Sequence, residues 1–210
     1  KSIKDKRFNY FLADKHTSLG EARNRAIKKC NGKFIAFLDC DDIWLPEKLK
    51  IQIPYFKKKS VGIVISDTIY FNSNRVIKQL YGKNPPPSGK VFRILLTLYF
   101  ISLETVIIRK KSLDDLHEYF DSRFEVIEEY DLLVRISFFW ELCYVDKVLS
   151  KWRVHNRSLT WRKPELFPSE TSLFLDKLIN TFPNIEKDYK LELDTIRANI
   201  SVDQALIFWA

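Results

Sequence analysis

The chain has 210 residues, which suffices for one domain, or for one domain with an appendage, and excludes a tandem array. Hydrophobic residues make up 46% of the sequence and aromatic residues 14%, so a packed core is expected and wholesale disorder is excluded. The 35 basic and 27 acidic residues give a net charge of +8, which fits either a lysine-rich surface or an anionic ligand.

Several classes of protein are disfavoured by what the sequence lacks. No apolar stretch reaches the ~18 residues that a membrane-spanning helix needs, and the polar first residues do not form a signal peptide. The three cysteines have no C-x-x-C spacing, which argues against zinc and against a disulfide framework. The basic residues are dispersed and no RNA-binding signature occurs, so nucleic acid is not expected as a partner. Because Met is absent and the first residue is Lys1, we expect a fragment or a processed chain.

Hydrophobic periodicity and turn residues predict alternating strands and helices along the chain. The predicted strands lie at residues 8–13, 33–38, 61–66, 105–109, 142–145 and 148–154. The predicted helices run from the S-x-x-E capping box at Ser18 to a stop at 31–32, from Pro46 to about Pro54, at 90–99, at 130–139, and from Glu165 onward with a break at Pro183. Three consecutive prolines predict an extended loop at 84–89. This alternation predicts an α/β layer architecture.

Three aspartates follow directly after the predicted strand at 33–38, which we expect to be central and buried on both faces. Asp39, Asp41 and Asp42 are therefore expected at the carboxyl end of this strand, where open α/β sheets bind ligands. Neighbouring carboxylates repel one another unless a cation neutralises them, and Mg²⁺ or Mn²⁺ suits oxygen donors. The alternative is a structural turn in which Asp42 caps the next helix.

Two segments around these aspartates follow a known pattern. Residues 19–24 (LGEARN) contain an A-R-N helix, and residues 32–49 (GKFIAFLDCDDIWLPEKL) follow G-x-[YF]-I-x-[FL]-L-D-x-D-D-x-[WY]-x-P. In order, spacing and residue type they resemble the family 2 glycosyltransferases of the GT-A fold. Similar segments follow at 89–96, 105–110, 124–136 and 152–160. Together the resemblance covers about residues 8–162.

The resemblance implies an α/β fold in which residues 1–162 form a partial GT-A domain, a Rossmann-like nucleotide-diphospho-sugar transferase sandwich. The family's opening V-S-V-I-I-P-x-Y-N strand and its D-D-x-S loop have no counterpart here, so we expect the domain to lack its first nucleotide-binding strands. Residues 163–210 are expected to form a C-terminal helical extension of two helices around Pro183. The side chains expected to face inward in that extension are Leu173, Leu175, Leu178 and Ile179.

The resemblance also implies roles for the acidic residues. Asp39 and Asp41 match the D-x-D pair that holds Mn²⁺ or Mg²⁺ and the donor diphosphate, with Asp41 as the more direct metal ligand. Glu129 stands where the family has the Asp that acts as catalytic base, and is longer by one methylene. Glu128 and Asp131 are its rivals because they share the same predicted turn. All three also fit the ordinary acidic bias of a first helical turn.

Five other residues are candidates for contacts with the substrate. Arg23 and His155 match positions that border the donor phosphates, although His155 also fits a structural hydrogen bond on a strand. Asp42 lies beside the D-x-D pair. Trp44 and Trp152 are candidates to line a sugar site through their aromatic faces, and core packing explains them equally well.

The resemblance implies an inverting, metal-dependent glycosyltransferase that moves a sugar from a nucleotide-sugar donor to a glycan or lipid-linked acceptor in bacterial surface polysaccharide synthesis. We expect a cytoplasmic protein at the inner face of the membrane. The apolar run at 138–140 (FFW) indicates a partner or a peripheral membrane contact. The alternative is a non-catalytic remnant that binds the acceptor and has lost transfer. Metal-dependent binding of a nucleotide distinguishes the two hypotheses.

Overall fold

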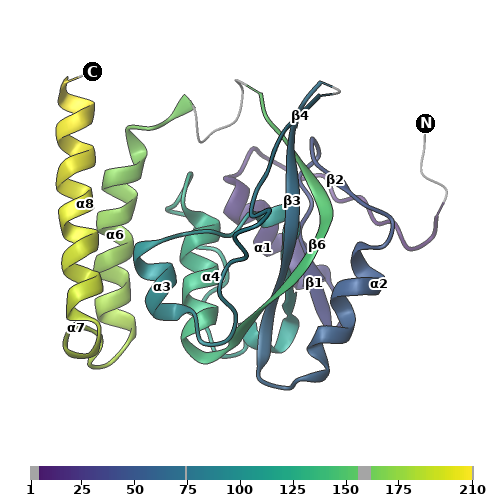
Figure 1. Cartoon of the computed structure of the whole chain (residues 1–210), viewed down its shortest axis with the longest axis horizontal. Coiled ribbons are helices and arrows are strands. Elements are labelled where there is room, and N and C mark those ends of the chain that lie inside the picture. Colours follow the sequence, from purple (N-terminus) through teal and green to yellow (C-terminus); the bar gives the residue numbers. More distant parts are fainter. Residues whose placement is uncertain (1–4, 74, 156–161, 210) are drawn as a thin grey trace.

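A mixed sheet with helices on both faces organises the chain in the computed structural model, which describes residues 5–73, 75–155 and 162–209 (Figure 1). In chain order the elements are α1 (Leu19–Lys29), β1 (Phe34–Ala36), β2 (Ile43–Trp44), α2 (Lys48–Gln52), the 3-10 helix η1 (Ile53–Lys57), β3 (Val61–Asn72), β4 (Arg75–Gln79), α3 (Phe92–Thr97), the 3-10 helix η2 (Leu103–Thr105), β5 (Ile107–Arg109), the 3-10 helix η3 (Lys110–Leu113), α4 (Glu128–Phe139), β6 (Glu141–Arg153), α6 (Leu166–Thr181), α7 (Ile185–Asp188) and α8 (Lys190–Trp209).

The strands follow the order β1-β5-β3-β6-β2, and β4 pairs with β3 outside this path. The two longest strands, β3 and β6, run parallel and lie side by side, whereas the other pairs in the described residues are antiparallel. The first half of β3 pairs with β5, and its second half pairs with β4. The strand β3 is therefore the centre of the sheet, and its carboxyl half carries the sheet toward the candidate site.

The alternation of side chains along β3 separates two cores. Ile63 and Ile65 point to the face covered by α1, α3 and α4, and Val64 points to the opposite face, covered by α2 and η1. All three side chains are fully buried. Burying one such side chain contributes roughly 1.5–3 kcal/mol, so this short apolar run anchors both helical layers.

Gly62 lets α4 end close against the start of β3. The pairing of β3 with β6 shifts register between Val61 and Ile63, which places Gly62 in an irregular position. A Cβ atom built on Gly62 would lie 2.4 Å from the Cβ of Trp140, which directly follows α4. A side chain at this position would push α4 away from the sheet.

The C-terminal helices pack on the outside of α3 and α4, with α6 and α8 side by side (Figure 1). Leu175 and Leu178 are buried in the same core as the sheet, and Leu173 and Ile179 are partly buried against it, so these side chains face inward as expected. The break after Pro183 is made by Asn184, which takes a left-handed conformation with φ of 62°. In the described part of the chain, no helix combines the length and the apolar character needed to cross a bilayer.

Several predicted elements differ from the observed ones. Residues 8–13 are not a strand but exposed coil, because the described sheet offers them no partner. The two strands expected at 142–154 are one strand, β6. The register shift between Ser66 and Asp67 of β3 takes up Asp146 and Lys147, the polar pair that separates the two predicted strands. The strand β1 is shorter than expected and lies at the edge of the described sheet rather than at its centre. The helix α4 begins at Glu128, two residues earlier than predicted.

Candidate active site

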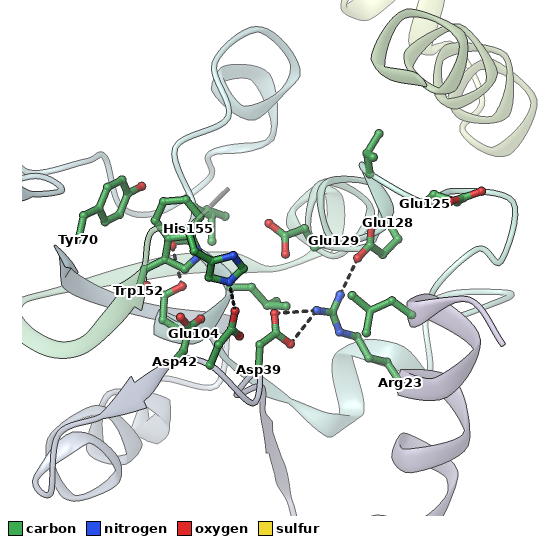
Figure 2. A pocket seen from close by; sticks show the side chains of 16 residues that line it. Arg23, Asp39, Asp42, Tyr70, Glu104, Glu125, Glu128, Glu129, Trp152 and His155 are labelled. Atoms are coloured by element: carbon green, nitrogen blue, oxygen red, sulfur yellow. Dashed lines mark hydrogen bonds and ion pairs between the residues drawn. The ribbon is translucent and has the colours of Figure 1, made fainter. Parts of the chain in front are cut away.

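A pocket of about 390 Å³ opens where the carboxyl end of β1 meets the first turns of α1 and α4 (Figure 2). The residues that line it are Leu19, Arg23, Asp39, Asp41, Asp42, Tyr70, Ile101, Ser102, Leu103, Glu104, Glu125, Val126, Glu128, Glu129, Trp152 and His155. Two segments face the pocket with acidic side chains. We call residues 39–42 the aspartate loop and residues 125–129 the acidic turn.

The pocket carries a concentration of negative charge, because seven of its lining residues are Asp or Glu and only Arg23 and His155 are basic. Burial above all, together with the charges of the neighbouring carboxylates, raises the pKa of Asp42 to about 7 against the opposing hydrogen bond from Arg153. Burial also raises the pKa of Glu104. Repulsion among these carboxylates favours a bound cation.

Arg23 joins the two acidic segments. Its Nη1 donates to Glu128 Oε1 at 2.8 Å, and its Nη2 donates to Asp39 Oδ1 at 3.1 Å. The next residue, Asn24, exchanges two hydrogen bonds with the backbone of Phe120, at 2.7 and 2.9 Å. The helix α1 therefore holds the segment that leads to the acidic turn and neutralises one carboxylate on each side of the pocket.

The helix α1 is placed by a local signal in the sequence. Ser18 is its N-cap, and the Ser18 hydroxyl accepts the backbone N–H of Glu21 at 3.3 Å. This is half of the capping box predicted at Ser18. The cap sets where the first turn begins, and thereby brings Arg23 to the pocket one turn later.

The end of β6 holds the aspartate loop. The backbone N–H of Arg153 donates to Asp42 Oδ1 at 2.8 Å, and Arg153 Nε donates to the carbonyl oxygen of Asp41, also at 2.8 Å. His155 Nε2 lies 2.7 Å from Asp41 Oδ2. Asp42 therefore does not cap the next helix, whose N-cap residue is Glu47. Its carboxylate fixes the loop to the sheet instead.

The donor set of the pocket suits a hard divalent cation in its chemistry. Asp39 and Asp41 offer carboxylate oxygens into the same pocket, and Glu104 Oε1 is buried without a hydrogen-bond partner among the described residues. Across those same residues, no group of three or more His, Cys, Asp or Glu side chains is placed to hold a metal ion. The protein alone thus provides a pair of donors, and a diphosphate would supply the remaining ligands of a cation held here.

The acidic turn separates its carboxylates into different environments. Glu128 is buried and bound to Arg23, whereas Glu129 is half-buried, points into the pocket in Figure 2, and has no hydrogen-bond partner for its side chain in the described ranges. Burial, and then the charge of Glu128, raise the pKa of Glu129 to about 8. Asp131 lies outside the pocket, fully buried, where Arg135 and Lys177 bind its carboxylate at 2.6 and 3.0 Å.

Comparison with known proteins identifies the family. Residues 1–117, more than half of the chain, match the family described as Glycosyl transferase family 2. The chain belongs to this family. A curated relative from Escherichia coli, the UDP-Glc:alpha-D-GlcNAc-diphosphoundecaprenol beta-1,3-glucosyltransferase WfgD, is 34% identical over 93 residues, which are 44% of this chain and 35% of that enzyme.

Solved structures share the fold of this family 2 glycosyltransferase. TarS 1–349 from S. aureus, in complex with UDP-GlcNAc, superposes with a TM-score of 0.64 at 22% identity over 84% of this chain and 52% of its own. The mannosyltransferase PcManGT from Pyrobaculum calidifontis, in complex with GDP-Man and Mn²⁺, gives a TM-score of 0.56 at 14% identity over 91% of this chain and 56% of its own. The GT-A fold predicted from the motifs is thereby confirmed, and the chain spans little more than half the length of these proteins.

The structure brings most of the predicted site residues together and leaves two of them apart. The residues that share the pocket are Arg23, Asp39, Asp41, Asp42, Glu128, Glu129, Trp152 and His155. Asp131 lies in the buried ion pairs described above, and Trp44 does not line the pocket. Trp44 Nε1 instead donates to the carbonyl oxygen of Glu104 at 3.0 Å, so its indole braces the pocket wall from behind.

Glu104 and Tyr70 are among the lining residues that sequence reasoning missed. Glu104 lies on η2, and its Oε2 accepts the hydroxyl of Ser102 at 2.6 Å. Tyr70 lies on the part of β3 beyond the predicted strand end at Ser66, and its ring packs 4.6 Å from that of Trp152. An acidic residue directly before a buried strand was the signal for Glu104. Tyr70 could be placed at the pocket only if β3 was known to extend beyond Ser66.

Proposed function

We propose that this chain is part of an inverting, metal-dependent glycosyltransferase that transfers a sugar from a nucleotide-sugar donor to a glycan or lipid-linked acceptor. One observation carries the proposal. The aspartate loop and the acidic turn face one pocket of about 390 Å³, with Asp41 on one side and a half-buried Glu129 on the other. This arrangement suits a donor diphosphate at the first segment and an acceptor hydroxyl at the second.

Asp39 and Asp41 are the residues that would hold Mn²⁺ or Mg²⁺ together with the donor diphosphate. When bound, a divalent cation stabilises the negative charge that develops on a departing diphosphate. The excess of carboxylates in the pocket supports this role. So do the UDP-GlcNAc bound to TarS and the GDP-Man and Mn²⁺ bound to PcManGT, two proteins with the same fold. Arg23 and His155 orient the two aspartates, and Trp152 offers an aromatic face toward the sugar.

Glu129 is the proposed general base. It accepts the proton of the acceptor hydroxyl while that oxygen forms a bond to the anomeric carbon of the donor sugar. The bond from the anomeric carbon to the diphosphate oxygen breaks on the opposite side, and the nucleoside diphosphate leaves with the electron pair. The other two candidates for the base already have charged partners: Glu128 is bound to Arg23, and Asp131 is bound to Arg135 and Lys177. A carboxylate with a raised pKa is a stronger base, and it accepts a proton more readily once it is ionised.

The acceptor is proposed to be lipid-linked, in bacterial surface polysaccharide synthesis at the cytoplasmic face of the membrane. The relative WfgD, which acts on a sugar linked to diphosphoundecaprenol, supports this choice. Exposed apolar side chains are available for a peripheral membrane contact. They include Phe139, where α4 ends, and Leu206, Phe208 and Trp209 in the last turn of α8.

Isothermal titration calorimetry of UDP or GDP binding, with and without Mn²⁺, tests the proposal. We expect the nucleotide to bind in the presence of Mn²⁺ and not in its absence, and we expect Asp41→Asn to remove this dependence while the fold persists. Asp176→Asn makes the same change of charge on the exposed face of α6 and should bind like the wild type. Nucleotide binding that ignores the metal, or no nucleotide binding at all, would favour the acceptor-binding remnant.

A further inference from the structure

A carboxylate from the C-terminal helices reaches the backbone of the acidic turn. Glu170 on α6 is 7% exposed. Its Oε1 accepts the backbone N–H of Glu125 at 2.8 Å, and its Oε2 accepts the N–H groups of Val126 at 3.0 Å and Ile127 at 3.2 Å. Three consecutive amides thus converge on one buried side chain that is 43 or more residues away in the sequence.

These hydrogen bonds fix the segment just before α4, a helix whose start has no cap from its local sequence. The N-cap of α4 is Ile127, whose side chain makes no capping hydrogen bond. Successive backbone N–H groups that point to one spot form an anion-binding concavity. Hydrogen bonds to a charged group are stronger than those between neutral groups, so Glu170 holds the backbone immediately before Glu128 and Glu129 in one conformation.

A second contact from the same helix holds the other end of this segment. Lys177 lies seven residues after Glu170, about two helical turns along α6. Lys177 Nζ lies 3.0 Å from Asp121 Oδ2 and 3.0 Å from Asp131 Oδ2. The acidic turn is therefore bound to α6 on both sides, through its backbone before α4 and through Asp131 within α4.

The helix that makes these contacts is itself rigidly placed. Phe174 and Leu175 lie between Glu170 and Lys177 on α6, and both are buried in the core that contains β3 and α4. The position of Glu170 is thus determined by packing rather than by the hydrogen bonds that it accepts.

We propose that Glu170 is a positioning residue for transfer, which orders the backbone of the acidic turn so that the Glu129 carboxylate faces the acceptor side of the pocket. The inference rests on the proposed function in one respect, the assignment of Glu129 as base. It gives the C-terminal helices a part in the reaction, although none of their residues lines the pocket. A misplacement of ~1 Å in a reacting group can cost on the order of 100-fold in rate.

The test compares Glu170→Gln, Glu170→Ala and the control Asp176→Asn, which removes an exposed carboxylate from the same helix. In hydrogen exchange we expect the amides of residues 125–127 to exchange at least ~10-fold faster in both Glu170 variants and unchanged in the control. In the full protein we expect kcat to fall by roughly 10- to 100-fold while the donor KM changes by less than about two-fold. Glu170→Ala should show the larger effect, because Gln keeps one acceptor oxygen.

Two results would overturn the inference. One is wild-type exchange at residues 125–127 in Glu170→Ala. The other is a loss of activity that only follows the loss of folded protein, measured by thermal unfolding, with kcat per folded molecule unchanged. A wild-type protein that transfers no sugar would count against the proposed function instead, and the exchange comparison would still decide whether Glu170 orders the turn.

Discussion

The two acidic segments of the pocket are held in different ways, and the difference suits different chemistry. In the aspartate loop the side chains of Asp39 and Asp41 are 44% and 39% exposed, and each has a basic neighbour, Arg23 or His155. In the acidic turn Glu128 is 6% exposed and Glu129 is half-buried. Exposed carboxylate oxygens are available to a cation, whereas a carboxylate that is buried beside another holds a proton more tightly. One pocket thus offers a cation site and a proton acceptor.

The supports of the two segments also differ in origin. The aspartate loop is held by the end of β6, which lies within the sheet. The acidic turn is held by α1 through Arg23 and by α6 through Glu170. Changes in α6 should therefore alter proton transfer at the acidic turn and leave cation binding at the aspartate loop intact.

The largest expected effect comes from Glu129→Gln. Removing a general base lowers kcat by roughly 100- to 10,000-fold, and donor affinity should hardly change because the base acts mainly in the transition state. Steady-state kinetics with titrated donor measures both quantities. Glu128→Gln is the matched comparison in the same turn. If Glu128→Gln lost turnover and Glu129→Gln kept it, the assignment of the base would pass to Glu128.

Asp131→Asn should affect the fold more than the reaction. Asp131 is fully buried, and its loss would leave Arg135 without its charged partner. Breaking a buried ion pair costs about 3–5 kcal/mol of the free energy of unfolding. Urea denaturation measures this loss, with Asp176→Asn as the exposed control. Normal stability combined with a turnover as low as that of Glu129→Gln would make Asp131 a catalytic residue and not a structural one.

How far the sequence predicts the site depends on whether a contact is local. The cap at Ser18 was predicted correctly because a hydroxyl three residues before an amide acts within one turn. The acidic turn was found from its motif, although its helix starts earlier than expected. Glu170 and Glu104 were missed because their roles depend on elements far apart in the chain, Glu170 binding amides 43 to 45 residues away. The edge position of β1 depends likewise on which strands pair with it.

The pH dependence of transfer should reflect the environment of Glu129. With a pKa of about 8, the carboxylate is mostly protonated at lower pH and cannot accept a proton. We expect kcat/KM to rise between about pH 6 and about pH 9, and Glu129→Gln to remove this rise. The same shift should make the fold less stable as pH increases from about 4.5 toward 8, because the folded state binds the proton more tightly than the unfolded state. A profile that is flat over this range would contradict a base with a raised pKa.

The smallest effect is expected from Ser18→Ala, which examines α1, the helix that contacts both segments through Arg23. Loss of the hydroxyl leaves the N–H of Glu21 without its acceptor, which costs about 0.5–2 kcal/mol of stability. Arg23 lies a full turn further along α1 and is held by Glu128, Asp39 and the ring of Phe120, 5.4 Å away. The first turn should therefore fray without moving the guanidinium. Urea denaturation should show the small loss of stability, while metal-dependent nucleotide binding and kcat should both stay within about two-fold of the wild type. If both fell together, the cap itself would be needed to hold Arg23 between the two segments, and the aspartate loop and the acidic turn would not respond independently.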